Sequence, residues 1–102
     1  MKDIKYLDDI QTELKVIMIK KHQDYGPFNI AYAPGGAMNG LIIRMHDKFE
    51  RLQNLYYNKS DTPNYESIED TLQDLANYAI IGLMVQRGQW KGLDETGLHK
   101  RI

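Results

Sequence analysis

The chain contains 102 residues, which is enough for a single domain, residues 1–102, with a small hydrophobic core. A net charge of −1 creates no strong overall field, which argues against binding to nucleic acid or to an anionic membrane. The absence of cysteine excludes disulfides and thiolate sites and fits a cytoplasmic protein. The first residues carry acids where a secretory signal would need an apolar stretch, and the longest apolar run, residues 79–85, is too short to span a bilayer.

The first predicted helix spans about residues 3–22, because its apolar side chains repeat every three or four positions. Gly26 and Pro27 predict its end. The turn before them brings a cation, a carboxylate and a phenol together at Lys21, Asp24 and Tyr25. Glycines and prolines then predict a loop over about residues 23–40. His22 is predicted to be a surface histidine.

The second predicted helix spans about residues 41–57 and carries one apolar stripe. Asp47 and Glu50 fall nearly opposite that stripe, one turn apart. A basic ridge lies between the two sides. It consists of Arg44, Lys48 and Arg51. The ridge could bind phosphates, since arginine contacts them bidentately, or it could pair with neighbouring acids.

The third predicted helix spans about residues 65–87, with Gly88 after its end. From Ala76 to Val85 it is apolar on almost every side, so it needs cover on every side. Three helices in one small chain cover it poorly. The sequence therefore predicts an all-α fold, a small bundle of three main helices completed by homo-oligomerisation into a four-helix or larger bundle.

Carboxylates on two facing helices suggest a metal site. Asp47 and Glu50 come from the second helix, and Asp70 and Asp74 come from one face of the third. Such oxygen ligands can hold Mg²⁺, or Mn²⁺ as the alternative ion, on a substrate phosphate. The competing interpretation is that the acids, Glu66 included, form solvated faces or intrahelical ion pairs. Asp74 fits that interpretation least, because its neighbours on the helix face are apolar.

Two polar residues follow Asp74 in the apolar stretch. The amide of Asn77 needs hydrogen-bond partners there, either across an oligomer interface or on a base or sugar. Tyr78 offers a phenol beside it. Trp90 is predicted to be a packing anchor. No histidine pair has the spacing of a zinc site.

Four ordered motifs resemble the small phage and bacterial proteins called nucleotide modification associated domain 1. They occupy residues 21–27, 44–52, 66–79 and 87–90. More distantly, the pattern is similar to the all-α nucleoside triphosphate pyrophosphohydrolases of the MazG and dimeric dUTPase group. That similarity implies two acidic pairs that bind Mg²⁺, with Asp47 and Glu50 as the first pair and Asp74 as the last acid. Thr71 stands where the group has Glu, and Asp70 could supply the missing oxygen.

The leading hypothesis is a Mg²⁺-dependent pyrophosphohydrolase of a free nucleotide, canonical or modified, in which Glu50 or Asp70 acts as the catalytic carboxylate on water. The residues predicted to bind the nucleotide are Lys21, Asp24, Tyr25, Arg44, Lys48, Arg51, Asn77 and Tyr78. The base is placed near Tyr25 and Phe28. A second hypothesis is a phage-encoded protein of the host cytoplasm that sequesters a nucleotide, including a cyclic signal, without cleaving it. A third is a structural helical module.

Overall fold

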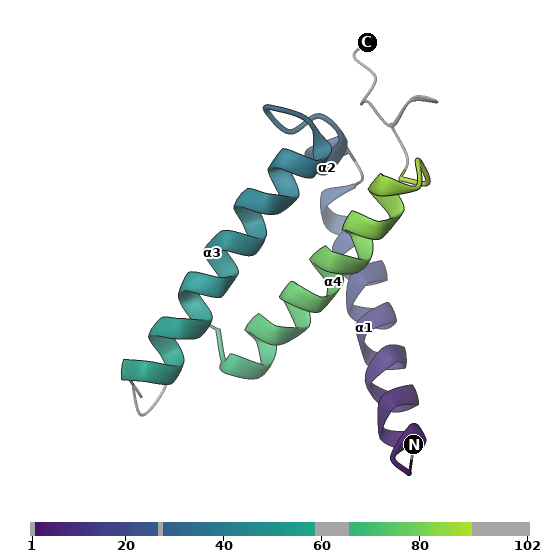
Figure 1. The fold of residues 1–102 in the computed structure, drawn as a ribbon. Coiled ribbons are helices and arrows are strands. Elements are labelled where there is room, and N and C mark those ends of the chain that lie inside the picture. The colour runs from purple at the N-terminus through teal and green to yellow at the C-terminus, as the bar shows by residue number, and fades with distance from the viewer. Residues whose placement is uncertain (1, 27, 59–65, 91–102) are drawn as a thin grey trace.

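The computed structural model describes residues 2–26, 28–58 and 66–90 of the chain. All regular elements in this part are helices: α1 (Ile4–Tyr25), α2 (Phe28–Ala31), α3 (Ala37–Asn58) and α4 (Ile68–Gln86). Helices α3 and α4 lie side by side, α1 crosses α4, and α2 packs on α3 (Figure 1). The all-α prediction is confirmed. None of the described helices is long and apolar enough to cross a membrane.

The predicted loop over residues 23–40 is largely wrong, because it contains helical structure. Helix α1 continues to Tyr25, and α3 already begins at Ala37. Between them, α2 buries Ile30 and Ala31 in the core. Burial of these apolar side chains stabilises helical turns that local glycine content does not favour.

Helix α1 ends at Tyr25, three residues beyond its predicted bound, and the predicted stop residue Gly26 forms its C-cap. Gly26 has a φ of 71°, a left-handed conformation that glycine adopts without steric cost. Its N–H donates to the carbonyl of His22 at 2.7 Å. This termination turns the chain so that the last turn of α1 faces α3 and α4.

Helix α4 begins at Ile68 rather than near residue 65, because a capping box starts it there. The Asp70 N–H donates to Ser67 Oγ at 3.0 Å, and the Ser67 N–H donates to Asp70 Oδ2 at 3.2 Å. This reciprocal pairing satisfies two N–H groups at the helix start. Glu66 therefore precedes the helix. The predicted end is confirmed, since Gly88 follows with a φ of 67°.

The main core lies where α2 and the first turns of α3 meet the last turns of α4. Leu41 is fully buried there, packed with Ile81, Val85 and Trp90. Trp90 is thus a packing anchor, as predicted. The N-terminal half of α1 extends beyond this core, and its side chains at Ile4 and Ile10 are exposed (Figure 1).

Gly40 marks the closest approach of α3 to the preceding chain. A Cβ added at Gly40 would lie 2.5 Å from the Cβ of Ala33, which is shorter than a possible contact. We expect Gly40→Ala to destabilise the protein by about 1–3 kcal/mol in urea unfolding, despite the better helix propensity of alanine. Gly82→Ala is the matched control, since its Cβ would meet Leu41 at an ordinary 3.9 Å. That variant should be neutral or slightly stabilised; equal losses in both would contradict the close-contact explanation.

Candidate functional site

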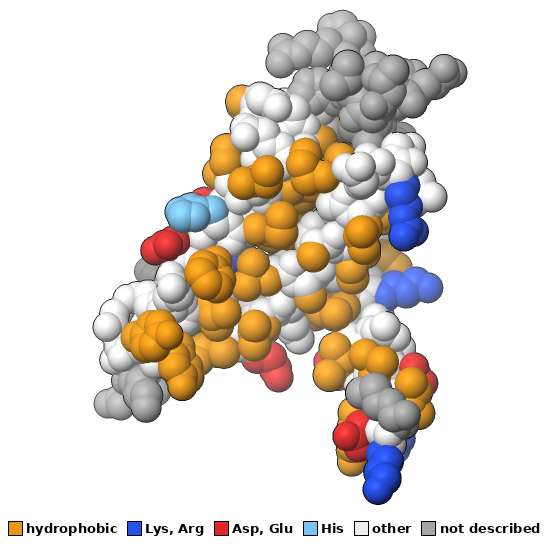
Figure 2. Space-filling view, viewed as in Figure 1, with side chains coloured by type: hydrophobic (Ala, Val, Ile, Leu, Met, Phe, Trp, Pro, Cys, Tyr) orange, Lys and Arg blue, Asp and Glu red, His pale blue; other side chains and the backbone are white. Residues whose placement is uncertain are grey.

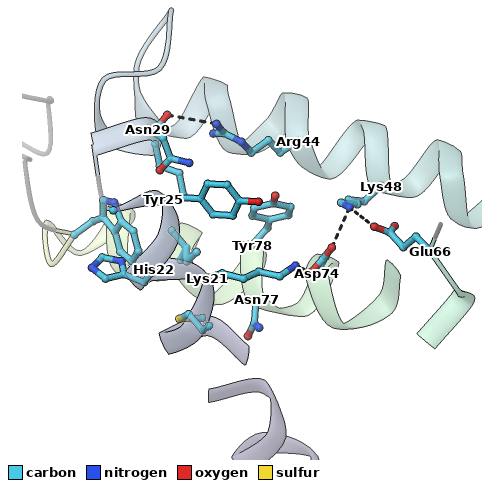
Figure 3. Close-up of a pocket in the computed structure, with 15 residues that line it drawn as sticks. Lys21, His22, Tyr25, Asn29, Arg44, Lys48, Glu66, Asp74, Asn77 and Tyr78 are labelled. Carbon is cyan, nitrogen blue, oxygen red and sulfur yellow. Dashed lines mark hydrogen bonds and ion pairs between the residues drawn. The ribbon is translucent and has the colours of Figure 1, made fainter. Parts of the chain in front are cut away.

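A cavity of about 410 Å³ opens between the last turns of α1, the start of α2, and the facing sides of α3 and α4 (Figure 3). Its size falls within the range of small-molecule sites. Polar and charged lining residues are Lys21, His22, Tyr25, Asn29, Arg44, Lys48, Glu66, Asp74, Asn77 and Tyr78. Every helix contributes to this cavity, so only the folded chain assembles it.

Asp74 lies at the charged centre of the cavity. Lys21 from α1 donates to Asp74 Oδ1 at 2.5 Å, and Lys48 from α3 contacts Asp74 Oδ2 at 2.9 Å. Only 11% of the Asp74 side chain is exposed, and a carboxylate so placed needs such neutralising partners. Asp74 therefore links α4 to both α1 and α3.

Lys48 bridges two carboxylates. Besides contacting Asp74, its Nζ donates to Glu66 Oε1 at 2.7 Å. Glu66 also accepts a hydrogen bond from Thr71 Oγ1 at 2.8 Å and contacts Arg51 Nε at 3.3 Å. Glu66 and Asp74 thus both contact one ammonium (Figure 3). The solvated face considered for Glu66 is wrong, and the ion-pair alternative for the basic ridge is confirmed at Lys48 and Arg51.

This network keeps its charges despite burial. Burial alone would raise the pKa of Asp74, but hydrogen bonds from Lys21 and Lys48 outweigh it and hold the pKa below 3.8. Burial likewise opposes the charge of Glu66, yet Lys48 and Thr71 hold its pKa below 4.5. The pKa of Lys48 is raised above 10.5, because its bonds to both acids outweigh desolvation. The network is therefore ionised at neutral pH.

The other end of the cavity is aromatic. His22 and Trp90 meet edge to face, with ring centroids 5.5 Å apart. Asn29 lies at the end away from Lys48, and the ring of Tyr25 extends toward Tyr78 in the middle of the cavity (Figure 3). Arg44 donates to the backbone carbonyl of Asn29 at 3.4 Å, which places its guanidinium beside this end. The cavity thus has a charged end and an end suited to a planar ring.

Asn77 joins α4 to α1. Its Nδ2 donates to the carbonyl of Leu14 at 3.1 Å, and the side chain is buried. Its Oδ1 has no hydrogen-bond partner among the described residues. The amide donor therefore has a partner within the chain, which is neither of the two kinds of partner that were predicted for it. Asn77 holds α1 where Lys21 can reach Asp74.

The structure brings together seven of the predicted site residues. They are Lys21, Tyr25, Arg44, Lys48, Asp74, Asn77 and Tyr78. Asp24 and Arg51 are exposed and do not line the cavity. Phe28, placed beside the base by prediction, instead stacks on Tyr32 with ring centroids 5.2 Å apart.

The four carboxylates predicted to hold Mg²⁺ do not converge within one chain. Asp74 faces the cavity, Asp70 caps α4, and Asp47 and Glu50 are exposed on α3. Across residues 2–26, 28–58 and 66–90, no three acidic or histidine side chains are grouped as metal ligands. The four-acid site does not fit this arrangement, and metal dependence stays a prediction.

Among the polar and charged lining residues, three were not predicted as site residues: His22, Asn29 and Glu66. Glu66 was predicted to lie within the third helix, where its side chain would point in a different direction. The Ser67-x-x-Asp70 spacing is a capping signal that would have placed Glu66 before the helix. No comparable signal marks Asn29, because its position depends on the packing of α2.

Comparison with known proteins gives one match. The sequence model of the family described as nucleotide modification associated domain 1 matches residues 21–85, which include all lining residues of the cavity except Met18 and Trp90. No curated protein is significantly similar to the chain. No solved structure is significantly similar either. Because the match covers more than half of the sequence, the chain belongs to the nucleotide modification associated domain 1 family.

Proposed function

We propose that the cavity binds a single nucleotide. The observation that supports this proposal most strongly is that Lys21 and Lys48, from two different helices, both contact Asp74. Three cationic side chains, including Arg44, line the cavity against two carboxylates, so the site favours an anionic ligand. The name of the family supports a role connected with nucleotides.

The charged end would hold the phosphates. Lys21 is about half exposed, so its ammonium can exchange Asp74 for a phosphate oxygen without a large rearrangement. Arg44 is held only through a neutral carbonyl among its described contacts, which leaves most of its guanidinium donors for a phosphate. Lys48 would strengthen the positive potential at this end of the cavity.

The aromatic end would hold the base. Tyr25 and His22 offer ring surfaces for stacking, and the amide of Asn29 can both donate and accept hydrogen bonds at a base edge. A volume of about 410 Å³ lies near the lower limit of ligand sites, which run from about 300 to 1,000 Å³. This size favours one nucleotide over a polymer.

A Mg²⁺-dependent hydrolase acting on a free or modified nucleotide is the second candidate. The observation in its favour is the Glu66–Asp74 pair, whose oxygens contact the same ammonium and so lie close together. The distant similarity to the MazG group supports it as well. Because the other predicted ligands lie elsewhere, we assign no metal-dependent step to these residues.

The test is calorimetric titration of wild type and Lys21→Ala with a panel of canonical and modified nucleotides. We expect Lys21→Ala to weaken binding by about 10- to 100-fold, the effect of losing one charge-assisted hydrogen bond. Lys20→Ala is the matched control, because Lys20 is exposed on α1 and does not line the cavity. Equal affinities of the two variants would contradict the assignment of the phosphate end.

A parallel incubation with and without Mg²⁺, followed by chromatography, separates binding from hydrolysis. Monophosphate and pyrophosphate formed only with the metal would establish the second candidate. An intact nucleotide that stabilises the protein would support binding alone, since a ligand at 100 times its Kd adds about 2.7 kcal/mol. Absence of any stabilisation by the panel would favour a structural helical module.

A further inference from the structure

The side of the α3–α4 pair that faces away from the cavity is apolar and exposed. On α3, Ile42, Phe49 and Tyr56 repeat every seven residues and so share one stripe. On α4, the exposed stripe consists of Ile68, Leu72 and Leu83. We call these two stripes the α3–α4 face, and Figure 2 shows hydrophobic side chains spread over both helices.

The α4 half of this face can be buried without burying a charge. Between Thr71 and Gln86 the only charged residue is Asp74, and it points into the cavity on the other side of α4. On α3, the cavity residues Arg44 and Lys48 likewise lie well around the helix from Ile42. On α3 the exposed side chains of His46 and Glu50 lie beside the stripe, at the edge of the face. A largely apolar surface offers little to a strongly charged partner or to lipid headgroups, whereas it matches another copy of itself.

The single chain leaves much of its apolar surface exposed. Among the described residues, six large hydrophobic side chains are buried, whereas seventeen are exposed. The radius of gyration is 15.3 Å, against about 13 Å for a compact domain of this length. The exposed apolar surface and the open shape both favour association with another copy.

The exposed area suits a dimer interface. Phe49, Leu72 and Leu83 are 51%, 50% and 56% exposed. At roughly 100 Å² for each half-exposed large side chain, the six members offer about 600 Å², against about 800 Å² that each partner gives to a standard interface.

We infer that two copies of the chain associate through the α3–α4 face. A two-fold axis would bring the stripes of one copy onto those of the other and form a four-helix bundle from both α3–α4 pairs. Both cavities would stay open, because they lie on the opposite sides of these helices. The sequence predicts an oligomer because α4 is apolar on almost every side, and this interface specifies how that oligomer forms. The inference does not depend on the nucleotide proposal.

Light scattering of the purified protein at 5 to 100 µM tests the interface. We expect the wild type to have the mass of a dimer and Leu83→Glu to have that of a monomer, with helical circular dichroism retained. Ile43→Glu is the matched control: Ile43 is 52% exposed on α3 but lies about 100° around the helix from Ile42, outside the face. It should remain dimeric. A monomeric wild type would overturn the proposal, as would equal masses for the two variants.

Single-cysteine variants give a second measurement that does not require a disruptive charge. The sequence has no cysteine, so Leu72→Cys, Leu83→Cys and Ile43→Cys each carry one thiol. Under mild oxidation we expect disulfide-linked dimers from at least one of the two face variants and none from Ile43→Cys. Crosslinking only at position 43, or at none of the three, would place the interface elsewhere.

Discussion

Replacement of Lys48 by methionine is expected to destabilise the protein by about 2–3 kcal/mol at pH 7, because it removes the ammonium that separates two carboxylates. Lys48 contacts Glu66 at 2.7 Å and Asp74 at 2.9 Å, and only 20% of its side chain is exposed. Methionine keeps most of the side-chain volume, so the loss reports mainly on charge. Urea unfolding measures it.

The sign of the pH dependence makes this prediction sharper. In the wild type, the pKa values of Glu66 and Asp74 are lowered from 4.5 and 3.8, so their stabilising contribution is present above those values and is lost as the pH falls below them. In Lys48→Met the two acids repel each other, and protonation relieves the repulsion. The difference between the proteins should therefore shrink from pH 7 to pH 4.

Lys20→Met is the control for this measurement, because Lys20 is exposed and does not line the cavity. It should change stability by less than about 0.5 kcal/mol at either pH. A loss in Lys48→Met that stays constant with pH would mean that packing, rather than charge, explains its effect.

Replacement of Asp74 by asparagine is expected to tighten nucleotide binding by about tenfold in the absence of metal. The substitution removes a negative charge beside the proposed phosphate position and releases Lys21 from its 2.5 Å contact. A like charge at about 4 Å costs up to about 4 kcal/mol near a protein surface, so 1.4 kcal/mol, or tenfold, is a modest share. Titration with and without EDTA measures the change.

The same variant decides between the two candidate functions. If Asp74 holds a metal for hydrolysis, Asp74→Asn should abolish Mg²⁺-dependent product formation and weaken binding instead of strengthening it. Asp24→Asn is the matched control, since Asp24 is an exposed acid of α1 outside the cavity and should leave both measurements unchanged. Weaker binding in Asp74→Asn alone would overturn the phosphate arrangement proposed above.

Local sequence patterns predicted the long helices well. The apolar spacing of residues 3–22 and the glycine at position 26 correspond to α1, and Gly88 marks the end of α4. These features depend on interactions within a few turns, such as side chains sharing one helix face and left-handed glycines. The capping box at Ser67 and Asp70 is equally local, and the metal role predicted for Asp70 overlooked it.

The burial of Asp74 was also predictable, because its neighbours on the helix are apolar. Its partners were not all predictable. Lys21 and Lys48 are 53 and 26 positions away in the chain, and nothing in local spacing indicates which cation reaches the carboxylate. The interpretation of paired acids on facing helices placed Asp47 and Glu50 opposite Asp74, whereas the rotation of α3 turns Lys48 toward it instead.

The sequence by itself determined the helical class, the glycines that follow α1 and α4, the need to neutralise Asp74 and the excess of apolar surface on α4. These follow from interactions between residues close in the chain. The tertiary structure decided which charges meet, the folding of α2 within a glycine-rich segment and the separation of the cavity from the apolar face. These depend on the rotation and crossing of whole helices, which are set by the packing of buried side chains such as Leu41 and Ile81.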